Sequence, residues 1–352
     1  MEFVYEASPQ RVIFAAGARA RVGEELGRLG VERAMVVTTP SQADVAAQFA
    51  RLIGERAGIV YPGAQMHTPT NVTEAALTAI SSVKADGILA IGGGSAIGMS
   101  KAIALRTDLP QLVVPVTFAG SEMTPILGET ERGEKITQRS PKVLPETVIY
   151  DPELASGLPP DVAGPSAMNA IAHAVEALYA RDGNPLVSAI AEEAIRTLAG
   201  ALPRLLADRA DMGAWSDALC GAWMAGSCLS SVGLGVHHKL CHTLGGMYDL
   251  NHAELHAVML PYSAAFNREA AAQAMRRAAR ALGADDAPSA LYELMLAAAP
   301  THSLKEMGLT RAALEKAADL AAKDPYDNPR PVTRDGLLEL LAAAHDGGRP
   351  HG

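Results

Sequence analysis

Short apolar runs alternate with helical patterns over the first 150 residues of the chain. The runs are almost continuous in Val, Ile, Leu and Ala, which is typical of strands that are covered on both faces. They lie at residues 11–14, 34–38, 58–61, 87–91, 112–115 and 147–150, with helical patterns such as 22–29 and 72–83 between them. This alternation predicts an α/β domain built on a doubly wound, mostly parallel sheet.

The strand signal ends at a proline-rich segment around residues 151–160. Long patterns rich in Ala and Leu follow, with helical periodicity, at residues 166–180, 185–206, 215–230, 269–282 and 311–322. We therefore predict two domains. An α/β dinucleotide-binding domain spans residues 1–155, and an all-helical catalytic or substrate domain spans residues 156–352.

The composition narrows the possible partners. Of the 352 residues, 49% are apolar and 20% are charged, so we expect a compact fold. The 39 acidic side chains exceed the 30 basic ones and give a formal net charge of -9, which excludes a general electrostatic surface for nucleic acid or an anionic membrane. We expect a small-molecule ligand, and an anionic ligand would need a local basic pocket.

The chain carries no clear targeting segment. Its first ten residues contain two glutamates and no basic stretch before an apolar run, so they do not resemble a signal peptide. The longest uncharged stretch, residues 218–236, approaches the length of a membrane span but contains four glycines and three serines. We interpret it as a buried helix followed by a functional loop. Cys220, Cys228 and Cys241 lack the spacing of a zinc or redox pair, so we expect reduced thiols in a cytoplasmic protein.

A glycine turn follows the strand at residues 87–91. Gly92, Gly93 and Gly94 remove every Cβ from the turn, so backbone N–H groups can approach a ligand closely, and Ser95 is expected to cap the next helix. The N-terminus of a helix at the carboxyl end of a parallel strand suits a phosphate. The turn predicts a nucleotide pyrophosphate site, although a tight structural turn would use the same residues. The G-x-G-x-x-G fingerprint of an ordinary Rossmann dehydrogenase is absent.

Other positions near this turn extend the predicted cofactor site. Gly98 weakens the helix and predicts a close approach. The loop after the strand at 112–115 offers hydroxyls and a ring for the nicotinamide side of a cofactor, from Thr117, Phe118 and Ser121. The second strand ends at Thr38 with no carboxylate before Asp44, so we expect NADPH to be accepted alongside NADH.

Histidines cluster in the predicted helical domain. Asn169 and His173 are four residues apart and share a helix face, His238 and His242 repeat that spacing, and His252 follows ten residues later. The cluster is either a metal site or a set of proton donors. Because Asn is a neutral and weak ligand, we expect much reduced affinity for a divalent metal.

Together these features resemble the iron-containing alcohol dehydrogenase superfamily over nearly the whole chain. The resemblance implies the fold predicted above, in the form also found in dehydroquinate synthase. The superfamily's glycine motif corresponds to residues 92–95. Its metal ligands, one Asp and three His, correspond to Asn169, His173, His238 and His252, and a further histidine beside the nicotinamide corresponds to His242.

Two departures narrow the resemblance. Gly98 and Asn169 each stand where the superfamily usually has Asp, and these departures, with the runs at 120–130 and 137–145, resemble the branch that reduces maleylacetate without a metal. The resemblance implies reduction of the C=C bond of maleylacetate, with chloromaleylacetate as a second substrate to test. The implied product is 3-oxoadipate, and the implied cofactor is NADH or NADPH. The resemblance also implies a place in the bacterial degradation of aromatic compounds and assembly as a homodimer.

The implied reaction assigns roles to the candidate residues. Hydride addition leaves an enolate, which Asn169 and the histidines at 173, 238, 242 and 252 would stabilise and protonate, and the sequence does not decide which histidine gives the proton. The two substrate carboxylates need cationic partners. The candidates are Arg139, Lys142, Lys239 and Arg330.

Other functions remain open. The main alternative is a metal-dependent alcohol dehydrogenase of the same superfamily, using Fe or Zn, and relatives of glycerol dehydrogenase or dehydroquinate synthase would share the architecture. Metal content separates these from the metal-free branch. A nucleotide-binding regulatory module would bind NADH tightly without turnover. A hydrolase is disfavoured because the G-x-S-x-G motif is absent.

Overall fold

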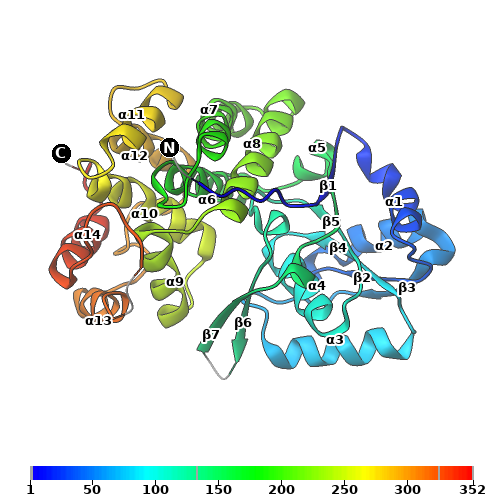
Figure 1. The fold of residues 1–352 in the computed structure, drawn as a ribbon. Coiled ribbons are helices and arrows are strands. Elements are labelled where there is room, and N and C mark those ends of the chain that lie inside the picture. Colours follow the sequence, from blue (N-terminus) through cyan, green and yellow to red (C-terminus); the bar gives the residue numbers. More distant parts are fainter. Residues whose placement is uncertain (1–2, 132–133, 324–325, 351–352) are drawn as a thin grey trace. The chain divides into compact units, whose positions relative to one another are not determined.

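The computed structural model describes residues 3–131, 134–323 and 326–350, which form two compact units (Figure 1). A sheet-bearing unit comprises residues 8–158, and a helical unit comprises residues 159–350 together with residues 3–7. The chain passes from one unit to the other between Leu158 and Pro159. The sequence places the boundary three residues earlier, and the functions assigned to the two domains remain predictions.

Six parallel strands form the sheet of the first unit, in the order β1-β8-β5-β4-β2-β3. They are β1 (Arg11–Phe14), β2 (Ala34–Val37), β3 (Ala57–Tyr61), β4 (Gly87–Gly92), β5 (Gln111–Pro115) and β8 (Thr147–Tyr150). Each overlaps one of the predicted apolar runs, and the predicted parallel α/β fold is confirmed. Because the strands are parallel and adjacent, the carboxyl ends of β2, β4 and β5 lie side by side at one edge of the sheet.

Helices cover both faces of this sheet. One face packs against α1 (Val22–Arg28) and α2 (Ala43–Ile53), and the other packs against α3 (Thr70–Ser82) and α4 (Gly94–Thr107). Within β2, Val36 belongs to the first face, whereas Met35 and Val37 belong to the second. Both faces are apolar, which explains why the strands are continuous rather than alternating in hydrophobicity.

A two-stranded antiparallel hairpin, absent from the sequence prediction, follows β5. It consists of β6 (Ile126–Glu131) and β7 (Glu134–Arg139). The hairpin sequence is rich in charged residues and lacks the apolar run that marked the other strands. A short helix, α5 (Pro152–Ala155), then ends the sheet-bearing unit.

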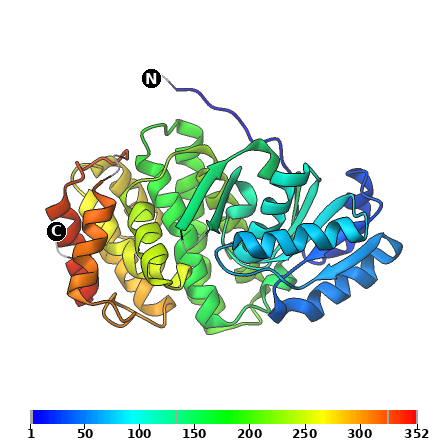
Figure 2. The same ribbon diagram turned by 90° about the horizontal axis from the view of Figure 1, so that it is seen from below.

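The second unit contains helices and no strand among its described residues, as predicted (Figure 2). Its helices are α6 (Pro160–Tyr179), α7 (Pro185–Ala207), α8 (Met212–Ser231), α9 (Val236–Tyr248), α10 (His252–Asn267), α11 (Ala272–Ala281), α12 (Ala287–Ala298), α13 (Arg311–Ala321) and α14 (Arg334–Asp346). Each predicted helical pattern overlaps one of them. The sequence analysis did not predict α9, α10, α12 and α14.

The uncharged stretch at residues 218–236 forms most of α8, a short connection and the first residue of α9. Its interpretation as a buried helix holds for α8, where Ala218, Leu219 and Ala222 are fully buried. Among the described residues, no single helix is long and apolar enough to cross a membrane. The pair α8 and α9, bent by 95°, meets the criteria of length and composition only when taken together.

Candidate active site

Three helices of the helical unit bring the predicted asparagine and histidines together. Asn169 and His173 lie one turn apart on α6, His238 and His242 lie on α9, and His252 begins α10. The ring centroids of His173 and His238 are 5.0 Å apart, those of His238 and His242 are 6.0 Å apart, and those of His242 and His252 are 6.1 Å apart. Spacing along the sequence therefore identified side chains that are neighbours in space.

Two further histidines, His237 and His256, belong to the same cluster. The His256 ring centroid lies 4.3 Å from that of His252 and 4.8 Å from that of His238, and the His237 and His238 centroids are 5.1 Å apart. Sequence reasoning did not select either residue. For His256 the signal was present, because it follows His252 by four residues on a helix.

The inner rings of the cluster are neutral. His173, His237, His238 and His256 are buried, whereas His242 and His252 are half-buried. Burial lowers the pKa of His237 and of His238 to about 3 and holds the pKa values of His173 and His256 well below their usual range. Neighbouring histidines lower three of these pKa values further, those of His173, His237 and His256. These rings therefore carry one proton each at neutral pH.

A hydrogen-bond chain fixes the proton positions on two rings. The Ser263 hydroxyl lies 3.1 Å from the Met259 carbonyl and 3.0 Å from the Leu260 carbonyl, so it donates its proton to the backbone. It then accepts from His237 Nδ1 at 2.9 Å, and His237 Nε2 accepts from His256 Nδ1 at 2.9 Å. This direction leaves a lone pair on Nε2 of His256.

A buried carboxylate, that of Glu176, lies next to the cluster. It is on α6, one turn after His173, and its Oε2 lies 2.7 Å from Nδ1 of His238. Burial raises the pKa of Glu176, and the neighbouring His237 and the hydrogen bonds that the carboxylate accepts oppose that shift. Sequence reasoning missed this residue, because a single Glu in an alanine-rich helix carries no spacing signal.

Several polar atoms of the cluster have no hydrogen-bond partner within the described chain. A buried polar atom left unpaired costs stability, so such atoms are expected where a ligand or water binds. The unpaired atoms are Asn169 Oδ1, His173 Nδ1, His238 Nε2 and His256 Nε2. They come from all three helices of the cluster and mark the position at which it can bind and act on a small molecule.

The glycine turn lies in the other unit, between β4 and α4. Gly92 adopts a φ of 145°, and a Cβ on Gly93 would lie 2.8 Å from the Thr117 side chain. Gly94 is exposed and has open space on its Cβ side, so a ligand can approach the first turn of α4 there. The side-chain oxygens of Thr117 and Ser121 are buried without a partner among the described residues.

The structure corrects several expectations for this turn. Ser95 does not cap α4: the N-cap is Gly93, which has no side chain to do so. The close approach predicted at Gly98 is made by Thr68, whose hydroxyl would lie 2.4 Å from an added Cβ. The hydroxyl of Thr38 already donates to the Ile91 carbonyl at 2.8 Å.

Phe118, predicted to line the nicotinamide, is fully buried. It therefore presents no exposed ring face to a ligand in this structure, and packing accounts for its position. Among the described residues of the loop after β5, the buried side-chain atoms without a partner are Thr117 Oγ1, Ser121 Oγ and Glu122 Oε2.

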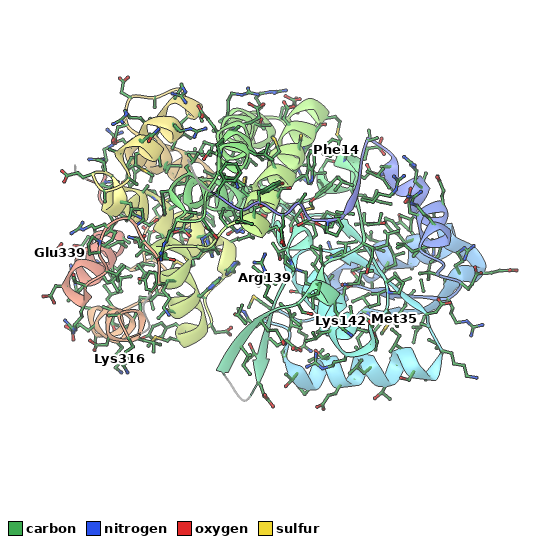
Figure 3. All side chains as sticks on the ribbon, in the orientation of Figure 1. Phe14, Met35, Arg139, Lys142, Lys316 and Glu339 are labelled. Atoms are coloured by element: carbon green, nitrogen blue, oxygen red, sulfur yellow. The ribbon has the colours of Figure 1, made fainter. Side chains whose placement is uncertain are left out.

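The four predicted cationic residues differ in their surroundings. In the sheet-bearing unit, Arg139 is exposed at the end of β7, whereas Lys142 pairs with Asp108 at 3.3 Å (Figure 3). Asp108 ends α4, so Lys142 lies about 20 Å along that helix from the glycine turn. In the helical unit, Lys239 Nζ lies 5.5 Å from the centre of the Tyr326 ring.

Arg330 does not join the histidine cluster. Its guanidinium lies 4.2 Å from the centre of the Phe266 ring and 4.0 Å from Glu339 on α14. Phe266 is ten residues after His256 on α10, a separation of about 15 Å along the helix axis. The expectation that Arg330 reaches the same site as the histidines is therefore not supported by this geometry.

Comparison with known families matches both parts of the chain. The model for iron-containing alcohol dehydrogenase matches residues 9–152, and that for the C-terminal part of the Fe-containing alcohol dehydrogenase family matches residues 164–345. The chain belongs to the iron-containing alcohol dehydrogenase family. The resemblance deduced from the glycine motif and the histidines is thus confirmed, and so is the fold that it implied.

Full-length relatives within this family are maleylacetate reductases. The maleylacetate reductase of Burkholderia cepacia is 50% identical over 348 residues, with 99% of each chain covered, and that of Sphingobium indicum is 49% identical, with 99% of this chain and 98% of the relative covered. The solved maleylacetate reductase from Rhizobium sp. strain MTP-10005 superimposes with a TM-score of 0.95 at 46% identity, covering 99% of this chain and all of that one.

The metal that names the family fits the cluster poorly. The position that corresponds to the family's anionic ligand holds Asn169, whose amide oxygen is neutral, and the His173 and His238 donors are neutral imidazoles. Among the described residues, the only group of three with donor atoms within 4.8 Å of one another is His237, Cys241 and His256. In that group, His237 Nε2 and His256 Nδ1 are hydrogen-bonded to each other and so do not both present a lone pair to a metal. Burial keeps the pKa of Cys241 well above its usual range, so its thiol stays protonated.

Proposed function

We propose that the chain reduces the C=C bond of maleylacetate to give 3-oxoadipate, with NADH or NADPH as reductant, in the bacterial degradation of aromatic compounds. The full-length identity of 46–50% to maleylacetate reductases supports the substrate. The observation that carries the proposal is the convergence of neutral, buried histidines with unpaired ring nitrogens beside Asn169. The rings of this cluster that present an N–H can stabilise an oxyanion, and the cluster can move a proton without a metal.

The reaction makes two demands on the protein. Reduced nicotinamide supplies a hydride when it is bound. The carbon β to the ketone gains that hydride, the C=C electron pair shifts and negative charge collects on the ketone oxygen. The chain must then hold the resulting enolate by hydrogen bonds and deliver one proton to the carbon next to the ketone, which completes 3-oxoadipate.

The proton positions divide these tasks among the histidines. Neutral His238 and His256 present lone pairs at Nε2, so in that state they accept hydrogen bonds rather than donate them. The donors to the enolate are then His173, His242 and His252. Proton transfer to carbon falls to one of these three, and Asn169 orients the substrate.

The cofactor site is the glycine turn in the sheet-bearing unit. The open side of Gly94, the N-terminus of α4 and the unpaired hydroxyls of Thr117 and Ser121 support binding of a dinucleotide there. We also propose that turnover needs no metal, which rests on the poor fit of the Asn169 site. The three free cysteines support a reducing, cytoplasmic location, and the homodimer implied by the family remains to be measured.

The test is oxidation of NADH in the presence of maleylacetate, followed by identification of the product. Formation of 3-oxoadipate with one NADH consumed per molecule is the expected result, and chloromaleylacetate and NADPH are then compared as substrates. Tight NADH binding without turnover would instead indicate a regulatory module. Oxidation of simple alcohols, with none of the maleylacetate activity, would indicate the alcohol dehydrogenase alternative.

A further inference from the structure

Glu176 makes an unusual set of contacts for a buried carboxylate. It is 1% exposed, and each of its oxygens receives two hydrogen bonds. Oε2 accepts from the Gly235 N–H at 2.9 Å and lies 2.7 Å from His238 Nδ1. Oε1 accepts from the Tyr179 hydroxyl at 2.9 Å and from the His237 N–H at 3.0 Å. These four bonds use the full acceptor capacity of a carboxylate.

Two of these bonds set the start of α9. The N-cap of that helix is Gly235, which has no side chain, and the unpaired N–H groups of Gly235 and His237 are satisfied by Glu176 from another helix. A negative charge at a helix N-terminus is favourable. A Cβ on Gly235 would lie 3.1 Å from Glu176 Oε1, so the glycine permits the approach. Glu176 thereby fixes the position of the helix that carries His238 and His242.

The bond to His238 determines which ring nitrogen holds the proton. A carboxylate can only accept, so a neutral His238 must carry its proton on Nδ1. The lone pair then lies on Nε2, which is the atom that is buried and unpaired in the cluster. A lone pair at that position can accept a hydrogen bond from a hydroxyl group or a bound water molecule, and so orient that group next to the substrate.

We propose that Glu176 is the positioning residue of the candidate site, which holds His238 as the Nδ1–H tautomer with its Nε2 lone pair directed at the reacting molecule. The kinetic part of this inference rests on the proposed function. The tautomer itself does not, because it can be measured in the absence of substrate.

The first test is NMR of the imidazole nitrogens in enzyme that carries isotope-labelled histidine, with the His238 signals assigned by their loss in His238→Gln. Wild-type His238 is expected to show a protonated Nδ1 and a bare Nε2. In Glu176→Gln one of the two accepting oxygens becomes an N–H₂ donor. With that group in the Oε2 position it donates to Nδ1 of His238, and the two nitrogens of His238 should exchange roles. A wild-type His238 with its proton on Nε2 overturns the proposal, whether or not any variant folds.

Asp182 provides a matched control. Its carboxylate accepts from the N–H of Gly233 at 3.0 Å, two residues before Gly235, and no ring contact or hydrogen bond to the histidines is recorded for it among the described residues. Asp182→Asn should leave both the His238 signals and the kinetics unchanged. If it alters His238 as strongly as Glu176→Gln does, the effect belongs to the connection between α8 and α9, and the proposal fails.

The second test separates positioning from folding. Glu176→Gln should lower kcat for maleylacetate about 10- to 100-fold, as for other residues that orient a reacting histidine, with the KM for NADH nearly unchanged. Tyr179→Phe removes one donor and leaves the carboxylate, so its kcat should stay within about threefold of wild type. An unchanged kcat in Glu176→Gln contradicts the inference. Wild-type enzyme that lacks maleylacetate activity altogether contradicts the proposed function, and the NMR result then stands by itself.

Discussion

Lys101 in the sheet-bearing unit and Glu176 in the helical unit are both buried ionisable side chains, and they are used differently. In the sheet-bearing unit, Lys101 on α4 is 1% exposed and donates to the Ser121 carbonyl, to the Thr124 and Ile126 carbonyls at 2.8 Å each, and to the Thr124 hydroxyl at 3.0 Å. All of these acceptors lie in residues 121–126, between β5 and the first residue of β6. The ammonium is fully satisfied by the protein.

In the helical unit, both oxygens of Glu176 accept hydrogen bonds, but the His238 ring that Glu176 contacts keeps one unpaired nitrogen. Its partner His238 ends in a bare Nε2, as His256 does at the end of the Ser263–His237 chain. A network whose members are all paired fixes a loop. A hydrogen-bond network whose last member lacks a partner leaves a polar atom that can bind a ligand. We expect this difference to separate structural from reactive buried charge in the molecule.

The largest expected effect tests the structural half of this comparison. Lys101→Met removes the hydrogen bonds of the buried ammonium to the carbonyls of Ser121, Thr124 and Ile126, which should cost about 3 kcal/mol or more of unfolding free energy. Denaturant unfolding measures the loss, and hydrogen exchange should show faster exchange in residues 121–126. Lys316→Met, on an exposed face of α13 (Figure 3), should change stability by less than about 0.5 kcal/mol. If Lys101→Met also lowers the free energy of unfolding by less than about 0.5 kcal/mol, Lys101 does not hold the loop at residues 121–126 in place.

Acid should destabilise the helical unit next most strongly. The pKa values of His237 and His238 are lowered to about 3 by burial, so the unfolded chain binds protons more readily below its ordinary histidine pKa. Stability is therefore complete above about pH 6.5 and falls as the pH drops, by about 1.4 kcal/mol per pH unit for each such histidine. Both tryptophans, Trp215 and Trp223, lie in α8, so tryptophan fluorescence reports this unit. A denaturation midpoint that is constant from about pH 7 to about pH 5 would disagree.

A carboxylate at position 169 tests whether the histidine cluster has low metal affinity because it lacks an anionic ligand. Asn169→Asp supplies the anionic ligand that the wild-type cluster lacks, and it should tighten Zn²⁺ or Fe²⁺ binding about tenfold or more. Calorimetric titration of wild-type and variant protein measures the difference. Equal affinity in the two proteins would mean that the amide is not what weakens the metal site.

The smallest effect concerns recognition of the substrate carboxylates. Lys239 and His242 are three residues apart on α9 and share a face, so Lys239→Glu should raise the KM for maleylacetate about tenfold. Arg330→Glu, with its side chain against Phe266, should change KM by less than about twofold. Steady-state kinetics measures the KM for maleylacetate in both variants. A larger increase in Arg330→Glu than in Lys239→Glu would assign recognition of the substrate carboxylate to Arg330.

The sequence predicted what depends on periodicity and spacing. Continuous apolar runs identified all six strands of the parallel sheet, and spacing of four residues identified Asn169 with His173 and His238 with His242. It could not predict contacts between distant segments. Glu176, His237 and Ser263 lie on three different helices, and only folding places them next to the ring nitrogens that they orient.

Errors at the glycine turn have a similar origin. Ser95 has the usual composition of a cap, but α4 begins earlier, at Gly94, so the serine lies within the first turn. The close approach predicted at Gly98 is confirmed, but the residue that makes it, Thr68, is thirty residues away in sequence. Local patterns locate a close approach without identifying its partner.

The central claim is that this cluster performs its chemistry with histidine and asparagine rather than with a metal. The most direct test is the rate of maleylacetate reduction in preparations whose metal content is measured before and after treatment with a chelator. The account predicts a kcat that does not vary with metal content and persists when metal is far below one ion per chain. Activity that is lost with the chelator and restored by Fe²⁺ or Zn²⁺ would contradict it.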